Sequence, residues 1–263
     1  IARRAADVWP MPNRPGLVDN YLENTSLQSG TEAFDVKADV QASARDTFFA
    51  RESLSQREIT DPPPGNVFMN NAFGINAKSR NQNAVVGYTR TFSPTKINEL
   101  RIGFNRYAVT HFGSDFGIAK NNELGIPNGN IAGHPYTFGI ARFAIPGIHP
   151  TGSLGSTNAV RIANTFQYTD SFTWIKGRHA LKFGGDIRWV QSTLTNPQTQ
   201  PRGQFQYDRN FSSNRGAAGT GSPWASFLLG HAWRIDRDFV DTRPGVRMTY
   251  WGFYAQDDFR LSP

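Results

Sequence analysis

The stretch from Asn164 to Gln191, NTFQYTDSFTWIKGRHALKFGGDIRWVQ, constrains the fold of this chain most strongly, because its hydrophobic residues recur at every second position. Polar residues fill the positions between them, and a Lys176-Gly177 step divides the stretch in two. Successive side chains of a β-strand point to opposite faces, so the stretch predicts two strands joined by a tight turn. One face of this hairpin would be apolar, with Phe166, Tyr168, Phe172, Trp174, Leu181, Phe183, Ile187 and Trp189.

Two kinds of β architecture produce such alternation. In a soluble sandwich the apolar face meets a second sheet. In a transmembrane barrel the apolar face meets lipid, the polar face lines the lumen, and aromatic residues gather at the two membrane–water interfaces. Aromatic residues towards the ends of the predicted strands favour the barrel. The predicted interface residues are Phe166, Tyr168, Trp174, Trp189 and Trp251.

The same alternation recurs along the chain and predicts about nine antiparallel strands. They are expected near residues 34–40, 47–55, 84–89, 99–105, 165–174, 181–189, 203–208, 233–239 and 246–260. Short connections follow the first, third and fifth strands and long ones follow the second and fourth, as in a barrel with periplasmic turns at one rim and extracellular loops at the other. The predicted fold class is all-β, an antiparallel transmembrane barrel wall with long extracellular loops.

We divide the chain into an irregular N-terminal segment, residues 1–31 with a short helix inside 1–8, and a partial barrel, residues 32–263. Pro, Gly, Asn and Ser predict long loops at 57–80, 111–161 and 195–202 and a flexible segment at 209–223. An odd number of strands cannot close a bacterial barrel. We therefore expect a piece of a longer protein, whose missing strands come from further residues, another chain or an assembly.

Four charged residues fall on the apolar parity of the predicted strands: Glu52, Asp170, Arg237 and Asp257. Near the middle of a bilayer, Arg costs about 2–4 kcal/mol and Asp or Glu costs less. We expect these residues either near a rim of the barrel or beside a bulge that shifts the register.

Composition argues against several other classes of protein. The apolar runs fall short of the roughly 18 residues that a membrane-spanning helix needs, and the mean hydropathy is −0.50. The net charge of +7 arises from scattered Lys and Arg residues, so no nucleic-acid partner is expected. The sequence has no cysteine, which excludes a disulfide framework and thiolate chemistry.

No sequence motif indicates catalysis, a metal or a cofactor. The five histidines show no spacing that would bring two metal ligands together. The sequence contains no nucleophile elbow, phosphate-binding loop or dinucleotide fingerprint. Asp257 and Asp258 are neighbours on a predicted strand, so their carboxylates would point to opposite faces. We therefore expect neither an enzyme nor a cofactor.

Several segments, in their order along the chain, resemble the barrel of TonB-dependent outer-membrane transporters, of the kind that carries a carboxypeptidase-regulatory-like domain and is abundant in Acidobacteria. The resembling segments are Pro12–Gly16 with Asn20–Tyr21, the run FDVKAD from Phe34, Phe49–Arg51, Arg80–Tyr107, Leu124–Pro127, Asn164–Arg188, Ser226–Gly230 and Phe253–Pro263. They cover most of the chain outside the long loops.

The resemblance implies an outer-membrane location and a complete barrel of about twenty-two strands around a plug domain. It also implies import of a bulky solute with energy from the inner-membrane protein TonB, in a setting of lipid and lipopolysaccharide. No plug or TonB box occurs in these residues, and the solute stays undefined. Polar-parity residues would line the solute path, contact the plug, or form ion pairs within the wall: Glu99, Arg101, Lys182, Asp186 and Arg188.

Two other classes of protein stay open at this point. A surface structural or adhesive protein would use the same module if copies of it assembled, and protein rather than lipid would then cover the apolar face. A secreted β-sandwich that binds glycans would need the apolar faces of two sheets to meet in one core.

Overall fold

The computed structural model describes the chain except for residues 17–18, 62–73, 153–158, 196–199, 216, 239–242 and 262–263. Much of the predicted loop 57–80 and of the predicted loop 195–202 lies outside the described residues, as does the last residue of the strand predicted at 233–239. Over the described residues the chain forms two β-sheets and several short helices.

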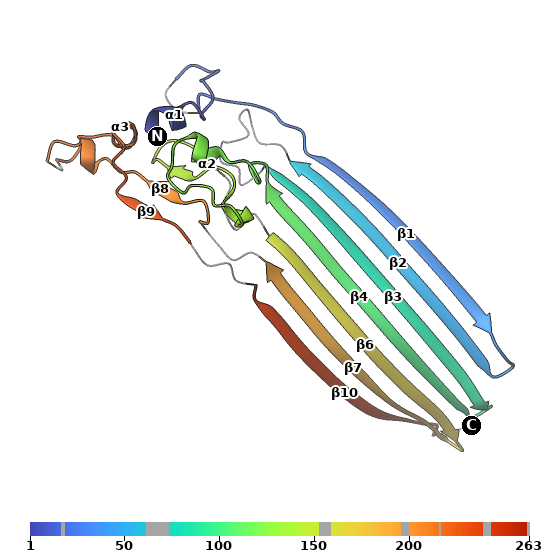
Figure 1. Ribbon diagram of the computed structural model, residues 1–263. Coiled ribbons are helices and arrows are strands. Elements are labelled where there is room, and N and C mark those ends of the chain that lie inside the picture. The colour runs from blue at the N-terminus through green and yellow to red at the C-terminus, as the bar shows by residue number, and fades with distance from the viewer. Residues whose placement is uncertain are drawn as a thin grey trace.

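Seven long strands form one antiparallel sheet, which we call the wall (Figure 1). The strands are β1 (Gln28–Gln41), β2 (Asp46–Asp61), β3 (Ile75–Ser93), β4 (Lys96–Gly113), β6 (Ala159–Lys176), β7 (His179–Thr195) and β10 (Gly245–Phe259). Each strand pairs with the next wall strand along the chain, so the order in the sheet is β1-β2-β3-β4-β6-β7-β10. This up-and-down order is that of a barrel wall, open here at β1 and β10.

The register of the wall connects the apolar sides of all seven strands. One row of paired residues runs from edge to edge through Ala38, Ala50, Val86, Ile102, Tyr168, Ile187 and Trp251. Directly paired residues point to the same side of a sheet, so these strands share one apolar face. A row on the opposite face runs through Asp39, Phe49, Gly87, Arg101, Thr169, Asp186 and Gly252. The predicted alternation is confirmed.

The short turns of the wall lie together at one end, which we call the turn rim (Figure 1). Residues 42–45, 94–95 and 177–178 connect the three hairpins there. Gly177 has a φ of +62°, a left-handed conformation that glycine adopts without a steric cost, and this allows the turn predicted at Lys176-Gly177. The long connections lie at the opposite end, which we call the loop rim.

The described parts of two long connections, between β4 and β6 and between β7 and β10, fold together with the N-terminal residues into a second unit, which we call the rim domain (Figure 1). It contains the helices α1 (Ala2–Ala6), α2 (Lys120–Glu123) and α3 (Pro223–Leu228), the 3-10 turns η1 (Pro135–Thr137) and η3 (Asn210–Ser212), and the strands β5 (Arg142–Ala144), β8 (Gln204–Gln206) and β9 (Arg234–Asp236). β8 pairs in parallel with β5 and antiparallel with β9.

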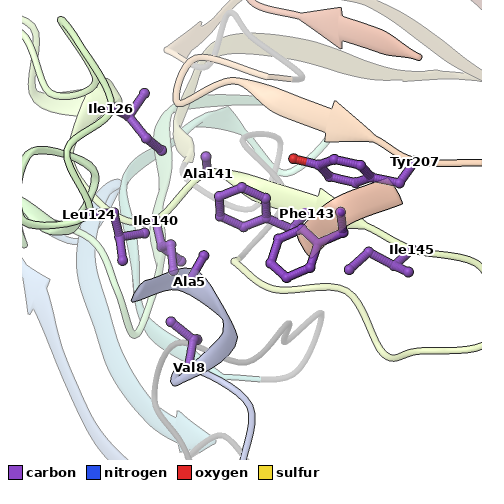
Figure 2. Packing of buried hydrophobic residues seen from close by; sticks show 10 residues of the cluster. Ala5, Val8, Leu124, Ile126, Ile140, Ala141, Phe143, Ile145 and Tyr207 are labelled. Carbon is purple, nitrogen blue, oxygen red and sulfur yellow. The ribbon is translucent and has the colours of Figure 1, made fainter. Parts of the chain in front are cut away.

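Most of the buried hydrophobic residues belong to the rim domain rather than to the wall. Their cluster comprises Ala5, Val8, Leu124, Ile126, Ile140, Ala141, Phe143, Ile145, Tyr207 and Phe227. Figure 2 shows Ala5 of α1 lying near Ile140, with Phe143 and Tyr207 further along the same cluster. Three segments far apart in the sequence therefore build one hydrophobic core.

The wall has seven strands in the described residues, whereas the sequence predicted about nine. Strands do form within the predicted segments 203–208 and 233–239, but they are β8 and β9 of the rim domain. Short strands alternate in polarity just as barrel strands do. Length separates the two kinds, because a tilted transmembrane strand needs about 9–11 residues.

The wall strands are longer than predicted. β2 continues to Asp61, β3 begins at Ile75 and β6 begins at Ala159, so the predicted loops 57–80 and 111–161 are shorter than expected. β1 begins at Gln28, inside the segment that was predicted to be irregular, and the helix predicted within residues 1–8 is α1. None of the helices in the described residues is long and apolar enough to cross a membrane.

Two of the charged residues on the apolar parity have simple explanations. Arg237 lies outside the wall, and its guanidinium donates hydrogen bonds to the carbonyl oxygens of Pro201 and Gly129. Asp257 lies in β10 near the turn rim, where one carboxylate oxygen is 2.7 Å from Nδ1 of His179. The expected position near a rim is therefore confirmed for Asp257.

The other two, Glu52 and Asp170, do lie on the apolar face. Asp170 accepts a hydrogen bond of 2.8 Å from the side-chain amide of Asn98. The register is continuous at both carboxylates, and the shift that the wall shows lies between Thr91 and Ser93. A local bulge, one of the two expected explanations, is therefore wrong for Glu52 and Asp170.

Candidate functional site: the two faces of the wall and the rim domain

The apolar face covers only the half of the wall next to the turn rim. Along each strand, from the turn rim towards the loop rim, this face carries mainly apolar residues first and polar residues after them. The last apolar residues are Phe34, Leu54, Ala84, Phe104, Phe166, Trp189 and Trp251, and the next residues on the same face are Glu32, Gln56, Gln82, Arg106, Asn164, Gln191 and Thr249. The boundary is present on all seven strands, so the apolar residues form a continuous band.

The dimensions and the exposure of the apolar band match those of a surface that contacts lipid. On β7 the band runs from Leu181 to Trp189, and about 9–11 residues of a tilted strand cross the hydrocarbon core of a bilayer. Trp251 is 65% exposed and Phe253 is 75% exposed. An exposed apolar surface of this extent requires a partner or a membrane.

Phe166, Trp189 and Trp251 lie at the boundary of the apolar band that faces the loop rim. The ring centroids of Phe166 and Trp189 are 5.8 Å apart, and Tyr168 lies one row closer to the turn rim. The sequence placed Phe166, Tyr168 and Trp189 towards strand ends, which is wrong. β6 continues past Phe166 and Tyr168 to Ala159, and β7 continues past Trp189 to Thr195. The edge of the band, rather than the end of the strand, sets the position of these rings.

Trp174 lies on the same face near the turn rim, at the other edge of the apolar band. The ammonium groups of Lys96 and Lys176 are 5.2 Å and 5.1 Å from the centroid of its ring. Aromatic and basic residues of this kind anchor proteins at membrane–water interfaces. The aromatic residues predicted for the interfaces therefore lie at two levels of one face.

The five predicted lumen residues all lie on the polar face of the wall. Arg101 and Asp186 are in one row, with Thr169 between them. A shallow hollow of about 320 Å³ lies beside this row, and all the predicted residues except Arg188 line it. Its lining comprises Glu99, Arg101, Thr169, Asp170, Ser171, Lys182, Gly185, Asp186 and Tyr254. The register brings together residues that are more than eighty positions apart in the sequence.

Only some of these charges are paired within the wall. Arg188 donates to Asp186 over 2.6 Å, and the side-chain amide of Gln167 donates to the same carboxylate over 3.0 Å. In the part of the chain that the structure describes, Glu99 and Lys182 have no ion-pair partner. The hollow therefore presents an acidic and a basic group that can bind a molecule inside the barrel.

Tyr254 is a residue of the hollow that the sequence did not single out. Its ring occupies the space above Gly184, where an added Cβ would lie 2.5 Å from Cε1 of the ring. Aromatic residues commonly pack over glycine on a neighbouring strand. The contact depends on the pairing of Tyr254 with Gly184 in the register of β7 and β10, and the sequence of a single strand does not reveal that pairing.

The rim domain contains an ion pair that is almost inaccessible to solvent. Nη1 of Arg202 lies 2.7 Å from Oδ2 of Asp115, and their side chains are 3% and 2% exposed. The same carboxylate oxygen accepts a hydrogen bond of 3.1 Å from the backbone N–H of Ile140. Burial lowers the pKa of the Arg202 guanidinium, and Asp115 acts in the opposite direction.

Other polar side chains fix the backbone around this ion pair. Asn121 is fully buried, donates to the carbonyl oxygen of Arg202 and accepts from the N–H of Ala141. Tyr207 is 5% exposed, and burial raises the pKa of its hydroxyl to about 12. Nothing in the sequence marked these residues as buried, because Asp115, Asn121 and Arg202 come from segments that were predicted to be loops, and Tyr207 comes from a segment that was predicted to be a barrel strand.

The described residues contain no group of three or more His, Asp or Glu side chains that is arranged to hold a metal ion. The carboxylates of Asp257 and Asp258 lie on opposite faces, opposite Leu181 and Ala180 of β7. The two neighbouring carboxylates therefore do not share a site.

Comparison with known proteins defines the class. The chain matches the family model of the outer membrane beta barrel domain over residues 1–263. It belongs to this family and is therefore a β-barrel protein of the bacterial outer membrane. No curated protein matches the chain, and neither does any solved structure. Barrels of this class have short periplasmic turns and long extracellular loops, so the turn rim faces the periplasm and the loop rim faces the cell exterior.

Proposed function

We propose that the chain forms part of the barrel of a TonB-dependent receptor, which imports a bulky solute across the outer membrane. The observation that carries this proposal is the hollow on the polar face, with Glu99 and Lys182 free of ion-pair partners in the described residues. Charged groups inside a barrel are available to a plug domain or to a passing solute. The resemblance of the sequence segments to barrels of this type, including those abundant in Acidobacteria, supports the same function.

The open edges of the wall fit a large barrel. β1 and β10 each have one neighbour in the described sheet, and every residue of both strands is exposed. A barrel wide enough to enclose a plug has about 22 strands. The proposal places the hollow against that plug, on the route of the solute, and involves neither a catalytic step nor a nucleic acid.

The test combines a binding measurement with a physiological one. The complete protein, purified from its own membrane, is mixed with the purified periplasmic domain of TonB from the same bacterium. We expect the two proteins to form a complex. We also expect wild-type cells to deplete a solute from the medium that is not depleted by cells lacking the gene for this protein or the gene for TonB. A folded protein that does not bind the TonB domain, with unchanged solute depletion in both deletion strains, would contradict the proposal.

A surface structural or adhesive role is the second candidate, and the rim domain favours it. This folded unit stands at the cell exterior and presents exposed apolar side chains, among them Leu229 at 63% and Trp233 at 51%. Such groups contact partner proteins or further copies of the chain. Cell-to-cell adhesion that is lost when Leu229 and Trp233 are both replaced by Ser, with unchanged solute depletion, would support this role instead.

A further inference from the structure

The outward face of the wall changes from apolar to basic directly above the apolar band, on the two central strands β3 and β4. Phe104 marks the edge of the band on β4 and packs against Phe166 of β6, with ring centroids 5.0 Å apart. The next residue of β4 on this face is Arg106, and Arg80 of β3 lies one row further towards the loop rim. Two guanidinium groups therefore lie just outside the hydrocarbon level, on the side that faces lipid.

The neighbours of these two guanidinium groups are amides rather than carboxylates. Arg106 pairs in register with Gln82 on one side and Asn164 on the other, and its Nη1 donates to Oδ1 of Asn164 over 3.1 Å. Arg80 lies opposite Gln56 of β2. In the wall as the structure describes it, neither arginine forms an ion pair. Glu58, on the same face of β2, is already paired with Lys78 at 2.9 Å.

We propose that Arg80 and Arg106, with Gln82 and Asn164, form a binding site for the phosphates of a phosphorylated glycolipid of the lipid A type in the outer leaflet. Arg binds phosphate through paired N–H donors, and the side-chain amides donate additional hydrogen bonds. The site lies at the level of lipid headgroups, since the residues below it are at the edge of the apolar band. It faces away from the lumen, so it rests on the outer-membrane location and not on the proposed transport.

The test measures lipid binding to the complete protein in detergent by native mass spectrometry. Bisphosphorylated lipid A is the probe, and lipid A without phosphates and phosphatidylglycerol are the comparison lipids. The double variant R80Q/R106Q should bind bisphosphorylated lipid A more weakly by about tenfold for each lost guanidinium. Binding of lipid A without phosphates should be the same for both proteins.

The matched control is R161Q, because Arg161 lies on the polar face, opposite Val109 of β4. This variant should bind bisphosphorylated lipid A as the wild type does. A heat-dependent shift in gel mobility verifies that each variant is folded, and binding of the TonB domain by R80Q/R106Q separates this site from the transport proposal. Equal lipid A binding by wild type and R80Q/R106Q, or an equal loss in R161Q, would overturn the site. Equal affinity for phosphatidylglycerol would overturn the assignment to a lipid A type of ligand.

Discussion

The wall and the rim domain both contain β-sheets, yet they use hydrophobic residues in opposite ways. In the wall the largest apolar side chains are exposed, with Phe253 at 75% and Trp251 at 65%. In the rim domain Phe143 and Phe227 are completely buried. The wall therefore depends on its backbone hydrogen bonds and on the membrane, whereas the rim domain depends on a core of its own.

The same contrast holds for charges. In the wall, the ion pair of Lys37 and Asp39 is more than half exposed, and such pairs contribute roughly 0–1 kcal/mol. The ion pair of Asp115 and Arg202 in the rim domain is 2–3% exposed. Substitutions should therefore affect the two regions very differently, and the two regions should unfold separately.

The largest expected effect follows from removing one half of the buried ion pair. Asp115→Ala leaves the guanidinium of Arg202 without this partner and the N–H of Ile140 without its acceptor. Breaking a buried pair in this way costs about 3–5 kcal/mol. Hydrogen–deuterium exchange of the complete protein should show rapid exchange in α2, β5 and β8 with an unchanged wall. The control Asp39→Ala, in the exposed pair, should change exchange in neither region, and wall exchange that rises in Asp115→Ala would contradict separate unfolding.

A substitution in the aromatic core should have a similar effect for a different reason. Phe143→Ala removes a fully buried ring that contacts Phe205 and Phe227, with a typical cost of about 3–5 kcal/mol. The rim domain should lose protection from limited proteolysis. Phe253→Ala, at an exposed position of the wall, should leave protease resistance of the rim domain unchanged. Equal effects of the two variants would show that the wall and the rim domain share one stability.

A charge on the apolar band should destabilise the wall by about 2–4 kcal/mol if it lies at the middle of the bilayer. Ile102→Arg places a guanidinium in the row of Val86 and Tyr168. Thr165→Arg places the same group on the polar face, opposite Asn105. Urea unfolding in lipid vesicles should show a lower midpoint for Ile102→Arg and little change for Thr165→Arg. The reverse order would mean that the two faces have been assigned the wrong way round.

The smallest effect concerns pH. The pKa of Tyr207 is raised to about 12 by burial, from an ordinary value of 10.0, so the folded rim domain holds this proton more tightly than the unfolded chain does. Its contribution to stability is complete below pH 10 and is lost as the pH rises from about 10 to 12. Protease resistance of the rim domain should fall in this window, and the fall should be smaller in Tyr207→Phe. An identical fall in the variant would assign it to other groups.

The wall could be predicted from the sequence because each strand carries its own pattern. The apolar parity of the hairpin around Gly177 and of the strand through Ile102 is local information, and the register confirms it. The upper edge of the apolar band was also present in the sequence, as the change from Phe166 to Asn164 and from Trp189 to Gln191 at alternate positions. It was missed because the change to polar residues was interpreted as the end of each strand, whereas the strands continue beyond it.

The rim domain could not be predicted in this way. Its core joins α1, the connection between β4 and β6, and the connection between β7 and β10. The short strands in the last connection alternate in polarity as wall strands do, so their pattern alone does not show that they join a different sheet. Arg202 lies in a polar segment where a charged residue is normally exposed, and its burial depends on Asp115, which is 87 positions away. Contacts at such separations are set by the wall, which brings the long connections together at one rim.

The most direct test of the account is the position of lipid along β7. The chain has no cysteine, so single cysteines can be introduced from Leu181 to Thr195 of the complete protein and spin-labelled in lipid vesicles. We expect collisions with oxygen, which dissolves in lipid, to peak at alternate positions from Leu181 to Trp189. Collisions with a water-soluble nickel complex should rise on both faces from Gln191 onward. Labels at Phe183, Ile187 and Trp189 that neither reagent reaches would contradict the account, because protein rather than lipid would then cover the apolar band.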